Sequence, residues 1–541
     1  MYNKVIPQLL TFRSHYWNMK IRVTNHSNGS TIHHPVILIR GCVENYSTDV
    51  WRKHSRSSVL VMLHTKVDQE KNANEMERLI SEIPMVKLKF KVVVKLHQGD
   101  NEIKFDFLGV KDILRISFKP SYTPYFVRLV YIVCKDDDGR FQSPTHLNNS
   151  IDVAIKKIRV AGQVLQCCMA ELIWTQNLGR KTFRLESDSI TGDPIVHIHH
   201  INITRQESYN MSAESLWEFL GRDILTSSIG DKKVKYLAFL SSTMYQNPKK
   251  IKPISHHETL KMTKGHIALG GGGLALFGTG CLWTWPTTVT SVQSTLCDTT
   301  PVDPCLYMDD SGYRGTVGGC VATTIGGVLH ELGHTLDLGH TEDGVMSRGF
   351  DDLDSLLTII SEKGGSRSGQ GTEGRRALTP CGRGPSPEQT KQPLILPPKS
   401  TNISSSQSPR FTSVRRSDSI SKYLEKYSEK RILGDSTSEG GCYWTRSCAL
   451  LLAHQPWIRK GHFNPCSAEL RISKHQVESC CTLAVVELRG KKGLVHQSWE
   501  SEPEADFRFL ELEGQMAVTT EHTELVAMSS CGKLNKYLLM G

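Results

Sequence analysis

The sequence has neither a CxxC motif nor a regular cysteine framework, and it lacks a clean membrane span. Its 15 cysteines are scattered, with adjacent pairs at Cys167 and Cys168 and at Cys480 and Cys481, which argues against a small disulfide-stapled fold. One uncharged apolar stretch, residues 267–285, is long enough to cross a bilayer, but six of its residues are glycines and four of these are consecutive. Because glycine disfavours a helix, we interpret the stretch as a strand, a glycine-rich turn and a second apolar segment.

Positive charge is in excess, but it does not indicate a nucleic-acid-binding protein. The net charge is +10, and residues 366–435 hold 13 Lys and Arg against 6 Asp and Glu. This segment is rich in Ser, Gly, Pro and Arg, a composition typical of a disordered chain. Charge in such a segment is usually solvated, and no DNA-reading or strand-stacking motif stands out. We therefore expect no nucleic-acid partner.

The N-terminal stretch also lacks the features of a signal peptide. It has no sustained apolar core and no small-residue cleavage site. We expect a cytoplasmic protein with reduced cysteines, while secretion stays open if the natural chain begins further upstream. The hydrophobic content of 38% and the charged content of 22% are typical of a soluble globular protein.

The length of 541 residues predicts about two to four domains in a multidomain α+β fold. Residues 1–145 contain short alternating strands, among them a hairpin over 86–107 and a strand over 125–134, and predict a β-sandwich. Helical and strand patterns alternate from about 150 to 285, which predicts an α/β unit within a domain placed at 146–363. The rest is predicted as a disordered insertion (364–441), a helical return to the α/β domain (442–475) and a β-rich C-terminal segment (476–541).

Three histidines in a predicted strand have no evident partner. His197 and His199 would share one face of the strand, with His200 on the other. A metal pair is conceivable there, but no acidic or cysteine residue follows at ligand spacing. We interpret all three as structural or exposed side chains.

A second group of histidines falls in the stretch GGVLHELGHTLDLGHTEDGVMSRGF, residues 326–350. His330 and His334 are four residues apart in a predicted helix, so they project from one face, one turn apart. Two imidazoles placed in this way can bind one Zn²⁺ at about 2.0–2.1 Å. Glu331, beside the first of them, can take a proton from a zinc-bound water.

The residues that follow extend this pattern. Gly339 is expected to break the helix by adopting a positive φ, which would turn His340 back toward the metal as a third nitrogen ligand. Met346 follows an Asp-Gly turn and would form an apolar floor below the ligands. Three histidines leave a fourth position for water, which is the open geometry of a catalytic zinc.

The stretch resembles the metzincin clan of zinc metallopeptidases, whose pattern is HExxHxxGxxH followed by a Met-turn. With "GHIALGGGGLALFG" upstream, it is similar to a little-studied family of zinc metallopeptidases found in fungi and animals. The resemblance implies a metzincin-like α/β catalytic domain with His330, His334 and His340 as zinc ligands, Glu331 as the general base and Met346 as the Met-turn residue. It also implies that residues 267–277 include an edge strand that pairs with an extended peptide.

Two positions depart from the clan pattern. Asp337 stands where the clan has its glycine, although aspartate tolerates left-handed conformations better than most residues. Arg348 stands where some members carry a tyrosine, so no tyrosine ligand is expected there. No oxyanion stabiliser beyond the zinc and no cysteine-bearing pro-segment can be identified.

Two functions remain from these observations. The first is a zinc-dependent metalloendopeptidase that hydrolyses a peptide or protein substrate through a zinc-bound water activated by Glu331. The alternative is a catalytically silent zinc-containing protein that binds protein or glycan partners through its β domains. Replacement of Glu331 separates the two, because a peptidase requires this carboxylate and a structural zinc site does not.

Overall fold

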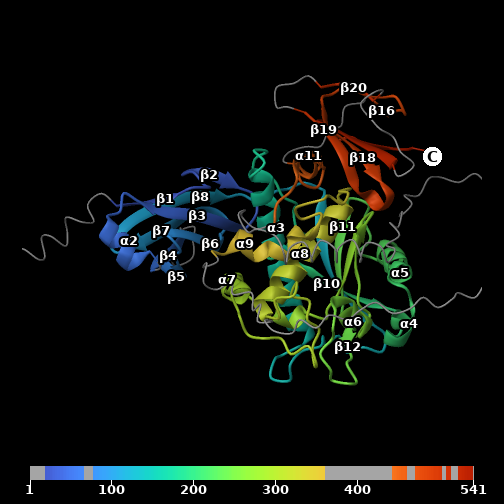
Figure 1. The fold of residues 1–541 in the computed structure, drawn as a ribbon, viewed down its shortest axis with the longest axis horizontal. Coiled ribbons are helices and arrows are strands. Elements are labelled where there is room, and N and C mark those ends of the chain that lie inside the picture. The colour runs from blue at the N-terminus through green and yellow to red at the C-terminus, as the bar shows by residue number, and fades with distance from the viewer. Residues whose placement is uncertain are drawn as a thin grey trace, which may run out of the picture.

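The computed structural model describes residues 19–55, 57–65, 77–359, 441–459, 469–501, 507–512 and 522–539. Within these residues the chain is a mixed α and β protein with several separate sheets (Figure 1). The insertion predicted over 364–441 lies outside the described residues, apart from Gly441. No helix in this part of the chain is long and apolar enough to cross a membrane.

Two sheets form the N-terminal part of the molecule and share one hydrophobic core. The smaller has the order β1-β3-β6 and the larger the order β2-β8-β7-β4-β5. Their elements are β1 (Lys20–Val23), β2 (Ser30–Ile32), β3 (Val36–Glu44), α2 (Thr48–His54), β4 (Ser58–Thr65), β5 (Glu77–Pro84), β6 (Lys89–Lys95), β7 (Gly99–Phe107) and β8 (Val110–Phe118).

The hairpin predicted over 86–107 is wrong. β6 pairs with β3 in the smaller sheet, whereas β7 pairs with β4 and β8 in the larger one. The chain therefore passes from one sheet to the other at the turn between β6 and β7. Alternation of apolar and polar residues predicts both strands but does not reveal the partner of either.

A five-stranded sheet lies at the centre of the molecule, with the order β10-β9-β11-β15-β14. The first four strands in this order run parallel, and β14 pairs antiparallel with β15 at the edge. The strands are β9 (Phe126–Cys134), β10 (Val196–Ile201), β11 (Val234–Leu240), β14 (Ala268–Gly271) and β15 (Leu274–Gly278). β14 and β15 confirm the strand, glycine-rich turn and second apolar segment expected in residues 267–285.

The strand predicted over 125–134 thus belongs to this central sheet and not to the N-terminal sheets. β9 lies between β10 and β11, and it is buried at Val127 and at every residue from Leu129 to Cys134. A strand covered on both faces reads as a continuous apolar run, which is typical of a parallel sheet flanked by helices.

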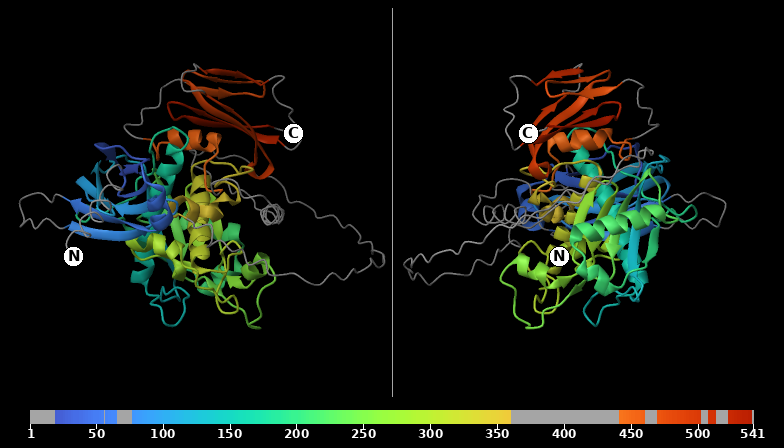
Figure 2. Two further views of the ribbon diagram at one scale, coloured as in Figure 1. Left: turned by 60° about the vertical axis from the view of Figure 1, so that its left-hand side comes forward. Right: turned by 90° about the vertical axis from the view of Figure 1, so that its right-hand side faces the viewer.

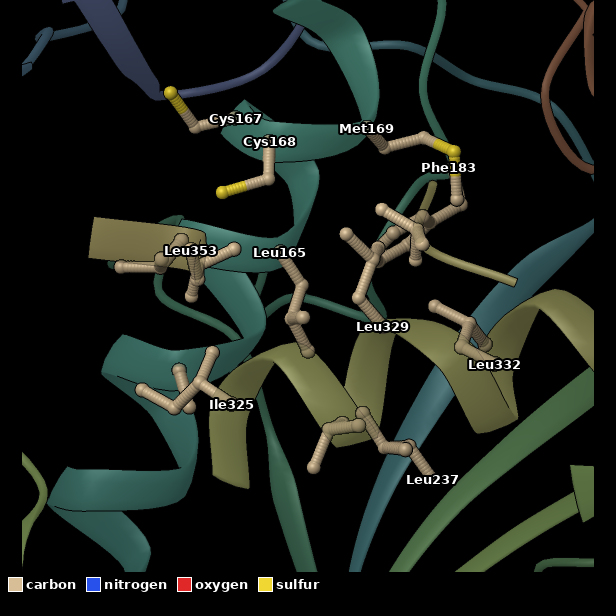
Figure 3. Close-up of a cluster of buried hydrophobic side chains, with 14 of the residues drawn as sticks. Leu165, Cys167, Cys168, Met169, Phe183, Leu237, Ile325, Leu329, Leu332 and Leu353 are labelled. Carbon is tan, nitrogen blue, oxygen red and sulfur yellow. The ribbon is translucent and has the colours of Figure 1, made fainter. Parts of the chain in front are cut away.

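Helices cover both faces of the central sheet. On one face, α3 (Ile151–Trp174) packs against α8 (Val317–Thr335), and Figure 3 shows Leu165 of α3 close to Ile325 and Leu329 of α8. On the other face, α5 (Ala213–Thr226) buries its apolar side against alternate residues of the same strands. Shorter helices connect these elements: α4 (Arg205–Asn210), α6 (His256–Lys261), α7 (Val292–Leu296) and α9 (Leu353–Leu357).

The C-terminal part adds a helix and two sheets. Helix α11 (Arg446–His454) packs into the same core as α3 and α8. Above it lie a sheet of order β19-β18-β21-β22 and a smaller sheet of order β16-β17-β20 (Figure 2). Their strands are β16 (Leu470–Ile472), β17 (Gln476–Ser479), β18 (Leu483–Gly490), β19 (Val495–Glu500), β20 (Phe509–Glu511), β21 (His522–Ser529) and β22 (Leu534–Leu538).

Candidate metal centre

Helix α8 carries the first three candidate residues; it is capped at its start and packs into the core near its end. The Thr316 side chain accepts a hydrogen bond from the Gly319 amide at its start. Leu329 and Leu332 are buried in the core shared with α3. This packing fixes the rotation of the helix, so that His330 and Glu331 line a cavity on its other side.

The turn after α8 differs in detail from the prediction. The helix ends at Thr335, and Asp337 has a φ of 65°, so aspartate provides the left-handed residue. Gly339 does not have a positive φ in the structure, and the expectation that it breaks the helix in this way is wrong. The absence of a side chain at Gly339 instead permits a close approach, because a Cβ at this position would stand 2.5 Å from the carbonyl oxygen of Gly493.

The imidazoles of His330, His334 and His340 converge on one point. One nitrogen from each ring lies within 4.8 Å of the other two, and Nε2 of His330 lies 3.1 Å from Nε2 of His334. Each Nδ1 lies at hydrogen-bond distance from a backbone carbonyl oxygen: His330 to Val345 at 2.7 Å, His334 to Leu338 at 2.9 Å and His340 to Lys492 at 3.1 Å.

These carbonyl contacts determine the tautomer of each ring. A carbonyl oxygen only accepts, so each Nδ1 donates its proton to it and the neutral ring has its lone pair on Nε2. Three Nε2 lone pairs facing one another repel unless a cation lies between them. The donor set therefore fits a metal that prefers imidazole, such as Zn²⁺, and the carbonyls are the outer partners that ligating histidines usually have.

Met346 lies directly beneath the histidine-bearing helix. It is buried, and a Cβ on Gly333 would stand 2.8 Å from its sulfur. The Met346 carbonyl accepts a hydrogen bond from the Thr341 amide at 3.2 Å, which closes the turn after His340. The methionine thus packs against α8 at Gly333, and its role as the Met-turn residue stays a prediction.

A cavity of about 490 Å³ opens beside the histidine cluster and is lined by His330, Glu331 and His340. This volume lies within the range of about 300–1,000 Å³ that is usual for ligand sites. One wall is apolar, with Phe239 packed edge-on against Trp285 at a centroid distance of 5.7 Å. Ala268 and Leu269 of β14 are also part of the lining.

The edge strand β14 approaches α8 so closely that only glycine fits at Gly270. A Cβ there would stand 2.0 Å from the carbonyl oxygen of Glu331, and backbone atoms cannot move aside. We predict that Gly270→Ala lowers the free energy of unfolding by about 1–3 kcal/mol, because the helix that carries Glu331 must shift. Gly271→Ala is the matched control, since its Cβ would meet only Trp217 at an ordinary 3.8 Å. Equal denaturation midpoints for the two variants would contradict this account.

The left-handed turn at Asp337 leads to a second expected result. Asp337→Gly should keep metal affinity, because glycine adopts this φ without strain and the partly exposed ion pair with Lys536, at 2.9 Å, is worth about 0–1 kcal/mol. Asp337→Val should weaken metal affinity. A left-handed conformation costs a residue with a side chain about 1–2 kcal/mol, and it costs a β-branched residue such as valine more. Zinc titration against a chromophoric chelator measures both. If valine is tolerated as well as glycine, the turn does not control the position of His340.

The strand histidines lie away from this cluster and pair with carboxylates. On β10, His197 lies 2.7 Å from Glu186, and His199 lies 2.6 Å from Asp223. These contacts agree with the prediction that the strand histidines are structural or exposed side chains and not metal ligands. In the described part of the chain, the histidine cluster is the one group of three or more possible metal ligands.

Two further cavity residues were not predicted to line the site. Arg348 lines the cavity and is held by Asp351, with its Nε 3.0 Å from the carboxylate. Tyr313 also lines the cavity, with a φ of 66° and an exposed side chain. Arg348 follows Met346 by two residues, but that position predicted only the absence of a tyrosine ligand, and no spacing connects Tyr313 to the histidines. A positive φ at a tyrosine is a feature that only coordinates reveal.

The arrangement belongs to the class of three-histidine metal sites with a carboxylate beside an open cavity. The chain belongs to the family described as "Putative peptidase family", whose model matches residues 20–381. That match includes the histidine cluster, Glu331 and Met346, and it ends before the C-terminal sheets.

Two curated relatives are proteins of fungi. The chain is 28% identical over 282 residues to a putative zinc metalloproteinase of Schizosaccharomyces pombe, covering 49% of this chain and 44% of the relative. It is 27% identical over 330 residues to a putative zinc metalloproteinase of Saccharomyces cerevisiae, covering 56% of this chain and 47% of the relative. The chain thus spans about half the length of either relative.

Among solved structures, the chain is similar to OgpA from Akkermansia muciniphila. The catalytically inactive form in complex with an O-glycopeptide substrate aligns with a TM-score of 0.36 and 10% identity, over 77% of this chain and 92% of OgpA. A wild-type crystal form aligns with a TM-score of 0.34 and 12% identity, over 77% and 92% of the two chains. Scores this low do not define a common fold.

Proposed function

We propose that the chain is a zinc-dependent metalloendopeptidase of the metzincin type. His330, His334 and His340 would hold the zinc through Nε2, and Glu331 would act as general base. The observation that carries the proposal is the convergence of three imidazoles, each oriented by a carbonyl on Nδ1, beside a cavity that Glu331 also lines. The names of the two fungal relatives support the choice of zinc and of peptide hydrolysis.

The chemistry divides between the metal and the chain. When bound, Zn²⁺ supplies a Lewis acid that polarises a carbonyl and makes water more acidic. Glu331 takes a proton from the attacking water and delivers it to the leaving amine of the peptide. Met346 and the buried residues beneath the ligands keep the rings in place, so that little reorganisation is needed during the reaction.

The edge strand β14 provides a means of holding the substrate. Among the described strands it lies at the edge of the sheet next to β15, and its first residues, Ala268 and Leu269, line the cavity. An extended peptide can add to such an edge through main-chain hydrogen bonds, which places successive side chains on alternate sides. One of these side chains would enter the cavity against Phe239 and Trp285, which favours an apolar residue there.

Cleavage of a mixed peptide library tests this function. The purified full chain should cleave internal bonds, lose activity with a metal chelator and recover it with added Zn²⁺. Product mass spectra identify the bonds that are cut. A zinc-loaded, folded chain that cleaves no peptide would instead favour the catalytically silent binding protein.

A further inference from the structure

We infer that the C-terminal hairpin, residues 489–495 where β18 turns into β19, is a positioning element of the metal centre. It holds His340 where the third ligand must lie. The inference rests on the proposed zinc site and goes beyond it, because it assigns a role at the metal to a segment far from the histidine motif in sequence. The family match ends at residue 381 and does not include this hairpin.

The first observation is that the backbone of His340 pairs with the hairpin as a strand would. The His340 amide donates to the carbonyl of Gly493 at 2.9 Å, and the Val495 amide donates to the carbonyl of His340 at 2.8 Å. The two segments form a parallel bridge between His340 and Leu494. These bonds fix the backbone of the third candidate ligand from both sides.

The second observation concerns the ring itself. Nδ1 of His340 lies 3.1 Å from the carbonyl oxygen of Lys492 at the tip of the hairpin. The other two rings take their carbonyl partners from Val345 and Leu338, which lie within the histidine motif. The orientation of the His340 ring therefore depends on a carbonyl group 152 residues further along the chain.

The third observation is that a buried arginine anchors the hairpin to the turn between α8 and His340. Arg489 donates to the carbonyl of Asp337 at 2.8 Å and pairs with Glu487 at 2.5 Å, and both charged side chains are buried. Burial alone would lower the pKa of Arg489, but Glu487 outweighs it and raises the pKa, so the guanidinium stays charged. Gly339 permits the close approach, since any Cβ there would meet the Gly493 carbonyl.

The backbone at the tip is also shaped for this contact. Lys492 has a φ of 65° and Gly493 a φ of 72°. A lysine in this region costs about 1–2 kcal/mol, and such strain persists where the surrounding structure determines it. The left-handed pair directs the Lys492 carbonyl at the imidazole, and the Lys492 side chain is not required for that bond.

Substitution of Gly493 tests the inference. Gly493→Val imposes a β-branched residue on a φ of 72°, while its Cβ meets no atom within 4 Å, so the change acts on the turn alone. Gly532→Val is the matched control, because it strains a turn of the same C-terminal region, with a φ of 89°, between β21 and β22. Lys492→Gly is the conservative variant, which keeps the carbonyl and relieves the strain.

Two readouts on the full chain measure the effect: zinc affinity by chelator competition, and the visible absorption spectrum of the Co²⁺-substituted protein. We expect Gly493→Val to lose about 10–100-fold in zinc affinity, as for other outer-shell changes, with an altered Co²⁺ spectrum. Gly532→Val and Lys492→Gly should resemble the wild type in both.

Each other outcome is decisive. A Gly493→Val protein that binds zinc with wild-type affinity and spectrum overturns the inference. Equal losses of zinc affinity in Gly493→Val and Gly532→Val also overturn it, because the cause would then be impaired folding of the C-terminal sheets. A folded wild type that binds no metal refutes the proposed zinc site itself, which is a different result from either.

Discussion

Glu331→Gln is expected to lower kcat by about 10²–10⁴-fold, the usual contribution of a general base, while zinc stays bound. The amide has nearly the shape of the carboxylate, but it cannot take a proton from water. Glu331 lines the cavity beside His330. The candidate ligands are the three histidines and not this carboxylate, so its replacement should leave the metal content unchanged. Single-turnover cleavage and elemental analysis of the same preparation measure both quantities.

Glu342→Gln is the matched control for this experiment. Glu342 lies eleven positions further along and is exposed, so the same chemical change there should leave kcat unaltered. If Glu331→Gln cleaves peptides at the wild-type rate, another group supplies the base and the proposed role is wrong. If it loses zinc as well, the carboxylate contributes to metal binding and the two effects cannot be separated.

His334→Ala is expected to remove the metal and, with it, all measurable peptidase activity. The substitution deletes one of three converging nitrogens and leaves His330 and His340 with an incomplete donor set. Zinc per chain should fall from about one to near zero. The wild type should also gain about 2.7 kcal/mol of stability when free zinc is 100 times Kd, and the variant should show no such dependence of its melting temperature on zinc.

A histidine outside the cluster provides the control for that loss. His200 lies on β10 and is exposed, so His200→Ala should keep one zinc per chain and full activity. If His334→Ala retains its zinc, residues other than this cluster bind the metal. Zinc lost from both variants would indicate a general effect of histidine number on weakly bound metal.

The candidate site could be predicted from the sequence as far as it is local. Helical spacing determines that His330 and His334 share a face, and the structure brings His340 and Met346 to the same place. The route of the chain differs, because Asp337 and not Gly339 adopts the left-handed conformation. Both residues permit such a turn, and in the structure Gly339 instead packs closely against the C-terminal hairpin.

The long-range parts of the fold could not be predicted in the same way. Alternation identified β6 and β7 as strands, yet they belong to different sheets. The sequence pattern groups β9 with the N-terminal sheets, although its continuous burial from Leu129 to Cys134 fits a strand covered on both faces. The contact of Lys492 with His340 is made by a carbonyl group, which every residue has, so no residue type could signal it.

Zinc K-edge X-ray absorption on the purified, zinc-loaded full chain tests the central claim most directly. The account predicts one zinc with three imidazole nitrogens at about 2.0–2.1 Å and one further light atom from solvent. Sulfur scatterers at about 2.3 Å, or a folded chain that takes up no zinc, would contradict it.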